Sequence, residues 1–310
     1  MCAKQKVLID TDIGDNMDDA FAIFAAMALN MEIVGITTVF RDTAARARMA
    51  KKLMTDYGCG YENIPVYAGY GAYSDLQETN SAYMGYFDPA LNLPEYAPEN
   101  THPEAAVDFI IDSCRRYGKE LTVIAIGPFC NIAKVIEKDP SALSSAGKVV
   151  IMGGAYFKQY ADWNVMCDVP AADRMFRSLP NLECIGADVT HRLIVDWLKP
   201  QLASKLDQLP YLASLYRRWQ EEYPREPLVL HDVLAVYYAA DPSICETHSI
   251  RVAVICEGFA KGLTLNVDAY NKTYLNSAYE GFDFGHRVLA AADVDLERFH
   301  RYISENISGR

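Results

Sequence analysis

Features that mark membrane, secreted and nucleic-acid-binding proteins are missing from this sequence. No segment approaches the roughly 20 consecutive apolar residues of a membrane-spanning helix, and the first residues contain neither an apolar signal region nor a small-residue cleavage site. Basic residues are scarce: 29 Lys and Arg stand against 41 Asp and Glu, which gives a formal net charge of −12. That charge argues against nucleic acid or an anionic membrane as the main partner, and we expect a cytoplasmic protein.

The eight cysteines are scattered and form no Cys-x-x-Cys pair, which disfavours a thiolate zinc site. Several lie in apolar runs, where cysteine is typical of a small core residue, and in the cytoplasm we expect them to stay reduced. Low-complexity linkers and internal repeats are also missing. Hydrophobic residues make up 51% of the 310 residues, enough for a sizeable core, and we expect a single domain over residues 1–310.

Strand-like and helix-like segments alternate along the chain. Short apolar runs at 7–9, 33–39 and 121–126 predict buried strands, and residues 44–57 predict an amphipathic helix. Repeated strand-then-helix units predict an α/β fold with an open, mostly parallel (mixed) sheet and helices on both faces. Residues 70–102 lack periodicity and predict a long loop. Further strands are predicted at 64–68, 148–152, 182–186, 250–256 and 262–267, and further helices at 103–117, 170–177, 196–223 (broken at Pro210), 232–240 and 295–306.

A dense group of aspartates follows the first predicted strand. Within ten residues the chain carries Asp10, Asp12, Asp18 and Asp19. Ligand sites in open α/β sheets lie beyond the carboxyl ends of the strands, and clustered carboxylates repel one another unless a cation or shared protons offset the charge. The pattern therefore favours a hard divalent cation bound by oxygens. The alternative is that Asp15 and Asp18 cap the following helix, but capping does not explain Asp10 and Asp12.

This segment, D-T-D-I-G-D-N-M-D-D-A, resembles the N-terminal signature of the inosine-uridine-preferring nucleoside hydrolases, in the longer of the two forms found in that family. Later segments resemble further family motifs, in the family's order, over about residues 6–240. They are A-I-G-P-F-C-N-I-A at 125–133, M-G-G at 152–154, D-W-N at 162–164 with Asp168 and A-A at 171–172, D-V-T-H at 188–191, and L-H-D-V-L-A at 230–235.

The resemblance implies the nucleoside hydrolase (Rossmann-like) fold and calcium-dependent hydrolysis of a ribonucleoside to ribose and free nucleobase. Asp12, Asp19 and Asp232 match the family's carboxylate ligands to Ca²⁺, and Ile126 takes the position whose backbone carbonyl binds the ion. Calcium accepts about six to eight oxygens, which leaves room for a water and the ribose diol. Asp12 also matches the general base that activates this water for attack on the anomeric carbon, through a transition state resembling an oxocarbenium ion.

The sugar contacts also follow from the resemblance. Asp18 and Asn164 match ribose-hydroxyl contacts, and Asp162 stands near the 5′-hydroxyl where the family usually has Glu. Asp10 is expected to orient the site from behind. The predicted substrate-binding residues are Asp18, Asp42, Met152, Asp162, Trp163, Asn164 and Asp232.

His231, beside Asp232, is the candidate to protonate the departing base, because an unperturbed imidazole titrates near 6.5. The alternative is a helix-start histidine that only packs or caps. His191 is expected to tie a strand end to a loop. Trp163 takes a position that is often Phe, and its ring faces the sugar or base or packs in the core. The tyrosines considered for stacking on a nucleobase are Tyr83, Tyr86, Tyr156 and Tyr223.

Three departures from the family pattern leave the nucleobase and the 5′ end of the substrate open. After Thr38-Val39 the family usually has Gly-Asn near the ribose, whereas this chain places Arg41 and Asp42 there. Many members carry a histidine in the loop equivalent to residues 80–91, where this chain has none. The segment between Met152 and Asp162 is short, and Gln159 is the candidate to replace a 5′-hydroxyl contact.

Two other functions fit parts of the sequence. Asp10-x-Asp12 also resembles the start of haloacid-dehalogenase-type phosphatases, which expect Thr or Val where this chain has Gly14. The other alternative is a calcium-dependent ribose- or nucleoside-binding protein without hydrolysis, motivated by Asp42 and the missing loop histidine. Family members are usually dimers or tetramers, so the resemblance alone implies a homo-oligomer.

Overall fold

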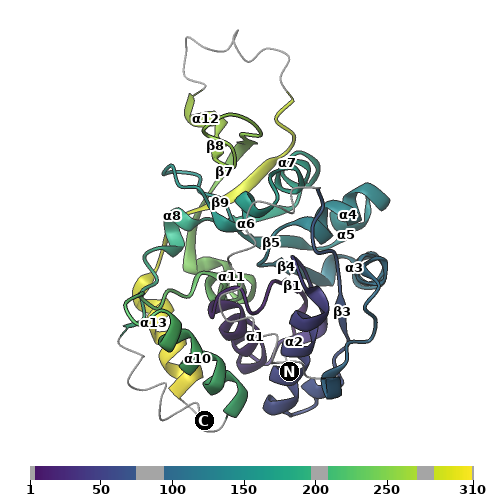
Figure 1. The fold of residues 1–310 in the computed structure, drawn as a ribbon. Coiled ribbons are helices and arrows are strands. Elements are labelled where there is room, and N and C mark those ends of the chain that lie inside the picture. Colours follow the sequence, from purple (N-terminus) through teal and green to yellow (C-terminus); the bar gives the residue numbers. More distant parts are fainter. Residues whose placement is uncertain (1–3, 75–93, 197–208, 271–282, 309–310) are drawn as a thin grey trace.

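The computed structural model describes residues 4–74, 94–196, 209–270 and 283–308. Its strands are β1 (Lys6–Thr11), β2 (Glu32–Thr38), β3 (Val66–Ala68), β4 (Leu121–Ala125), β5 (Lys148–Met152), β6 (Leu182–Ile185), β7 (Cys245–Val254), β8 (Thr264–Asn266) and β9 (Arg287–Val294). They form one sheet in the order β3-β2-β1-β4-β5-β6-β9-β7-β8 (Figure 1). The strands from β3 to β9 in this order are parallel, and β7 and β8 run antiparallel at one edge. The expected open, mixed α/β sheet is confirmed.

Helices cover both faces of this sheet. Alternate residues of β1 point to opposite sides, so Val7 and Ile9 join one hydrophobic cluster and Leu8 joins the other. None of the helices in the described ranges combines the length and hydropathy needed to cross a bilayer. The helices are α1 (Asp18–Ala28), α2 (Thr43–Tyr57), α3 (Pro103–Tyr117), α4 (Cys130–Lys138), α5 (Ala142–Ser145), α6 (Trp163–Cys167), α7 (Val169–Ser178), α8 (Ala187–Thr190), α10 (Pro210–Glu222), α11 (His231–Ala240), α12 (Val267–Tyr270) and α13 (Leu296–Ser308).

The C-terminal part of the sheet differs from the sequence prediction. No strand was expected at 287–294, where β9 lies between β6 and β7. Its centre is a run of three alanines, which carries little β-propensity, and its neighbours in the sheet determine its conformation instead. β7 begins at Cys245 rather than at residue 250, because its polar first half pairs with the end of β9. Of the two helices predicted at 196–223, the second is α10, and 197–208 lie outside the described residues.

The strand order brings the site together. β2 and β3 follow β1 on one side, and β4 pairs with β1 on the other, so the order reverses between β1 and β4. Open α/β sheets bind ligands at such a switch point, beyond the carboxyl ends of the strands. Asp10 pairs with Ala125 in neighbouring strands, so Asp12 and Ile126 both follow strand ends at this point. Helices α1 and α11 lie side by side, and the backbone N–H of Asp232 donates to Asp18 across their N-terminal ends (Figure 1).

Candidate active site

A cavity of about 500 Å³ opens beyond the carboxyl ends of the central strands. Its wall contains all but one of the predicted catalytic, metal-binding and substrate-binding residues. The predicted residues that line it are Asp12, Asp18, Asp19, Ile126, Met152, Asp162, Trp163, Asn164, His231 and Asp232. Lining residues outside the predicted catalytic, metal and substrate sets include Asp15, Asn16, His191, Trp219, Tyr223 and Glu226.

Three buried carboxylates at the floor of the cavity form a group able to hold a metal ion. One oxygen each from Asp18, Asp19 and Asp232 lies within 4.8 Å of the others. Asp18 and Asp19 open α1, and Asp232 is the second residue of α11, so the packing of these two helices builds the group. The Thr11 hydroxyl donates to Asp19 Oδ1 at 2.5 Å and orients it. The group differs from the predicted ligand set, in which Asp12 stood in place of Asp18.

Burial makes these carboxylates costly to ionise. Desolvation, and then the negative charge of neighbouring aspartates, raise the pKa of Asp19 and Asp232 well above the usual range. Burial likewise raises the pKa of Asp18 to about 6. A divalent cation reverses this penalty, because an opposite charge within a few ångströms favours the ionised form. The donors are all oxygens, so the group fits a hard cation of the calcium or magnesium kind.

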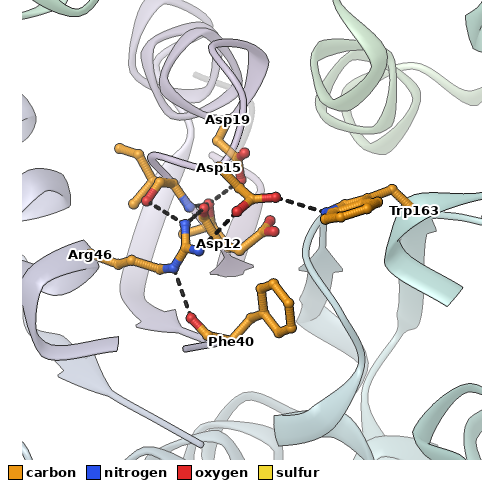
Figure 2. Close-up of polar contacts among 8 residues, drawn as sticks. Asp12, Asp15, Asp19, Phe40, Arg46 and Trp163 are labelled. Carbon is orange, nitrogen blue, oxygen red and sulfur yellow. Dashed lines mark hydrogen bonds and ion pairs between the residues drawn. The ribbon is translucent and has the colours of Figure 1, made fainter. Parts of the chain in front are cut away.

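The turn after β1 is held by a buried arginine of α2 (Figure 2). Arg46 is 1% exposed, and its guanidinium donates to three backbone carbonyls and one carboxylate. The carbonyls belong to Asp12, Ile13 (3.0 Å) and Phe40 (2.8 Å), and the carboxylate oxygen is Asp15 Oδ1 (3.2 Å). Burial, followed by the charges of Asp19 and Asp15, raises the pKa of Asp12 well above its usual range, while Arg46 opposes that rise.

Asp15 and Arg46 were both missed from the sequence. Asp15 falls in the two-residue extension of the first motif and was not expected in the site, yet it is buried and lines the cavity. A signal for Arg46 does exist. Arg46 precedes Ala50 by four residues and Leu53 by seven, so it lies on the apolar face of the predicted amphipathic helix.

Carboxyl ends of β4 and β5 supply the next part of the wall. The Asn164 side-chain amide donates to the carbonyls of Ile126 (3.0 Å) and Met152 (3.1 Å), and so ties α6 to both strand ends. Asp162 caps the N-terminus of α6, with Oδ1 accepting from the Val165 backbone N–H at 3.1 Å. Burial raises the pKa of Asp162 to about 6. The D-W-N segment thus contributes three consecutive side chains to the cavity.

Behind the cavity, Asp10 supports the ends of the central strands. It is fully buried, and its Oδ1 accepts hydrogen bonds from Thr37 (2.6 Å) and Asn131 (2.7 Å). Burial raises its pKa to about 7, against the effect of these two donors. It does not line the cavity, which agrees with the expected orienting role.

His231 begins α11 on the cavity wall. Its Nδ1 lies 2.6 Å from the Thr190 hydroxyl, and its ring centroid lies 5.4 Å from that of His191. Burial, and then the neighbouring His191, lower the pKa of His231 to about 3, so the ring is neutral at neutral pH. His191 was expected only to tie a strand end to a loop. His191 also lines the cavity, and its ring packs edge-on against that of Tyr160, with 4.9 Å between the ring centroids.

Asp42 is the predicted substrate residue that the structure places elsewhere. It is exposed and does not line the cavity. Its Oδ1 accepts from the Ala45 backbone at 3.0 Å and caps α2, so we correct its assignment from a sugar contact to a helix cap. The preceding Phe40 and Arg41 have φ of 71° and 58°. Left-handed backbone favours glycine, which matches the family's usual Gly at the Arg41 position.

The residues considered for stacking on the base or contacting the 5′-hydroxyl also divide into those that line the cavity and those that do not. Tyr223 lines the cavity, whereas Tyr156 is buried in the core, with its hydroxyl donating to the Gly153 carbonyl at 2.5 Å. Gln159 is exposed and does not line the cavity. Tyr83 and Tyr86 lie outside the described residues.

Comparisons with known proteins agree with this site. Residues 7–301 match the family model of the inosine-uridine preferring nucleoside hydrolases. A probable uridine nucleosidase 1 of Oryza sativa subsp. japonica is 27% identical over 316 residues, which cover 97% of this chain and 96% of that protein. The solved plant nucleoside hydrolase PpNRh1 has a TM-score of 0.80 at 25% identity, over 99% of this chain and 100% of that chain. A purine-preferring ribonucleoside hydrolase from Gardnerella vaginalis has a TM-score of 0.76 at 29% identity, covering 98% of both chains.

The family match extends to residue 301, beyond the stretch of about residues 6–240 that carries the sequence motifs. It confirms the resemblance and sets aside both the phosphatase and the non-enzymatic alternatives. The chain belongs to the inosine-uridine preferring nucleoside hydrolase family and is a hydrolase of N-glycosidic bonds.

Proposed function

We propose that the protein hydrolyses a ribonucleoside to ribose and a free nucleobase, with Ca²⁺ as its cofactor and Asp12 as the general base. The observation that carries this proposal is the group of Asp18, Asp19 and Asp232 carboxylates within 4.8 Å of one another, in a cavity that also holds Asp12. Family membership supplies the reaction class, and this group supplies a place for the cofactor.

The ion would be held by Asp12, Asp19 and Asp232 with the carbonyl of Ile126, and Asp18 stands close enough to join them or to take a ribose hydroxyl. When bound, calcium offers Lewis-acid activation of water and an anchor for two vicinal hydroxyls. Asn164 already donates to the Ile126 carbonyl at 3.0 Å, so its amide holds that oxygen at the cavity wall.

Asp12 is suited to accept the proton of the attacking water. Its backbone is fixed by Arg46, while its side chain lines the cavity. Proton removal generates the nucleophile that attacks the anomeric carbon, and positive charge develops on the sugar ring as the bond to the base breaks. The surrounding carboxylates stabilise that charge, since they are already oriented before the reaction begins.

His231 assists the departing base as a neutral hydrogen-bond donor in this proposal. The lowered pKa argues against a protonated imidazolium at neutral pH. In this proposal Nδ1 accepts from the Thr190 hydroxyl 2.6 Å away, which puts the ring proton on Nε2 and provides one N–H for the leaving group. On the strength of the family resemblance alone, we further propose that the enzyme acts in the cytoplasm as a homo-dimer or homo-tetramer.

The experiment that tests the proposal is release of free base from a panel of purine and pyrimidine ribonucleosides, with added Ca²⁺ and with a chelator. We expect base release from at least one nucleoside in calcium and none after chelation. Hydrolysis that is indifferent to chelation would reject the cofactor, and no hydrolysis of any nucleoside would reject the substrate class.

A further inference from the structure

Asp15 forms a buried ion pair with Arg46 and also accepts a hydrogen bond from Trp163 (Figure 2). Asp15 Oδ1 accepts from the Arg46 guanidinium at 3.2 Å, and Asp15 Oδ2 accepts from the Trp163 indole N–H at 2.7 Å. Asp15 and Arg46 are both buried, whereas Trp163 is 36% exposed at the cavity. A single carboxylate therefore joins the turn after β1 to the first residue of α6.

Arg46 uses its other donors on backbone carbonyls of two strand ends. The carbonyls of Asp12 and Ile13 follow β1, and the carbonyl of Phe40 follows β2. A guanidinium presents its donors in a rigid planar fork and stays charged when buried. Arg46 therefore fixes the positions of these four acceptors relative to one another. A lysine cannot reproduce that fork.

In this arrangement the backbone of the proposed base, Asp12, is fixed while its side chain stays available for the reaction. Arg46 contacts the backbone carbonyl of Asp12, and the Asp12 side chain is left to face the cavity. The buried positive charge also opposes the repulsion that Asp12 receives from Asp15 and Asp19. Loss of the fork would thus move the base, and loss of Asp15 would release the indole.

We propose that Arg46 and Asp15 are positioning residues: Arg46 fixes the proposed base Asp12, and Asp15 fixes the Trp163 ring as a flat wall against the bound nucleoside. This inference rests on the proposed function, because it assigns Trp163 to substrate binding and Asp12 to the chemistry. A purely structural ion pair predicts a different outcome, in which its variants lose stability and the site stays unchanged.

The first test is independent of activity and follows the indole N–H resonances of the ¹⁵N-labelled protein. The Trp163 signal is assigned by its disappearance in Trp163→Phe. We expect Asp15→Asn and Arg46→Lys to shift this signal, because a bond to a carboxylate is stronger than a bond to an amide and depends on where Arg46 holds Asp15. Asp42→Asn and Arg48→Lys are matched controls on the same helix segment, and both should leave it in place. A Trp163 signal that does not move in Asp15→Asn or in Arg46→Lys would overturn the proposal.

The second test is a kinetic double-mutant cycle on the hydrolysed nucleoside. Trp163→Phe keeps an aromatic ring but removes the indole donor, and we expect it to raise KM about tenfold. Asp15→Asn should have a similar effect, and the double variant should resemble either single variant, because both changes interrupt one contact. Arg46→Lys should lower kcat by about 100-fold with little change in KM.

Independent, multiplying effects of Asp15→Asn and Trp163→Phe would contradict the proposed link between them. Should Arg46→Lys fail to fold, the Asp15 and Trp163 arm decides the question alone. Should the wild-type protein hydrolyse no nucleoside, the proposed function fails and the indole resonances still decide whether Arg46 and Asp15 position Trp163.

Discussion

The carboxylates on the two sides of the cavity differ in how their negative charge is compensated. On one side, Asp18, Asp19 and Asp232 lie close together and are buried; burial opposes the ionisation of all three, and the charges of neighbouring aspartates further oppose that of Asp19 and Asp232. On the other, Asp15 places its two oxygens on Arg46 and Trp163. Aspartates only a few residues apart in sequence therefore differ in what compensates their charge. Asp18 and Asp19, with Asp232, require an external cation, whereas Asp15 is paired with Arg46 of the same chain.

This comparison suggests why the first motif is longer here than in the shorter family form. Asp15 and Asn16 form the two-residue extension, and Asp15 is the residue that meets Arg46. The extension adds a carboxylate to an already acidic turn, and the helix that follows β2 supplies the compensating cation. The carboxylates of Asp18, Asp19 and Asp232 are thereby left for a ligand, whereas Asp15 is paired with Arg46 and Trp163.

Removal of calcium is expected to have the largest effect on activity. It should change the side of the cavity with Asp18, Asp19 and Asp232 and leave the contacts of Asp15 unchanged. Chelation should lower base release by more than about 1,000-fold, since the attacking water loses the cation that activates it and the ribose hydroxyls lose their anchor. The thermal midpoint should also fall, because a ligand at about 1,000 times its Kd stabilises the fold by about 4 kcal/mol. Thermal unfolding and base release should be measured with and without the chelator. The Trp163 indole resonance should not move, and a large shift there would mean that the two sides are not separate.

Asp18→Asn distinguishes the observed carboxylate group from the predicted ligand set. If Asp18 shares in holding the ion, its loss should weaken calcium affinity by at least about tenfold, measured by titration calorimetry. Asp42→Asn removes the same charge from an exposed cap and is the matched control. Unchanged calcium affinity in Asp18→Asn would return Asp18 to a ribose contact alone.

The acidic side should also make the calcium-free protein sensitive to pH. A carboxyl whose pKa is raised in the folded state stabilises the fold below its unfolded pKa, and that stability is lost as pH rises through the folded value. Burial raises the pKa of Asp18 and Asp162 to about 6 and that of Asp10 to about 7. The free energy of unfolding should therefore fall by a few kcal/mol between about pH 4 and about pH 7.

Denaturant titrations across this range, with and without calcium, check that expectation. Calcium should remove the part of the decline that comes from the metal-binding carboxylates. It should leave the parts that come from Asp10, which does not line the cavity, and from Asp162, which is outside the proposed ligand set. A calcium-free protein that gains stability over the same range would contradict the direction of these pKa shifts.

The smallest effect is expected at Asp42. Its replacement by Ala removes the cap of α2 and should lower the free energy of unfolding by about 1 kcal/mol. Because Asp42 does not line the cavity, kcat/KM should change by less than a factor of about two. Denaturant unfolding and steady-state kinetics measure the two quantities, and a large loss of kcat/KM would restore Asp42 to the substrate contacts.

Local patterns in the sequence were enough for most of the fold. The helix predicted at 103–117 is α3 over those residues, because Pro103 begins it and Gly118 ends it. Strand β9 was missed, since its alanine-rich centre resembles neither a strand nor a helix and is defined by β6 and β7 on either side.

Within the site, residues that follow strand ends were predictable, and contacts between distant segments were not. Asp12 and Ile126 follow neighbouring strands, so topology alone places them together. Asp232 meets Asp18 over 214 residues of sequence, and only the family motif pointed to it. Arg46 meets Asp15 across 31 residues; helical spacing places Arg46 on the apolar face of α2, but no pattern in the sequence identifies Asp15 as its partner.

Replacement of Asp12 by Ala, assayed in calcium on the best nucleoside of the panel, tests the central claim most directly. Its side chain is buried at the cavity wall, and its main-chain contacts with Arg46 do not require the carboxylate. We therefore expect a folded protein, verified by its thermal midpoint, whose kcat is lower by about 1,000-fold or more. A folded Asp12→Ala protein that releases base at the wild-type rate would contradict the proposed mechanism.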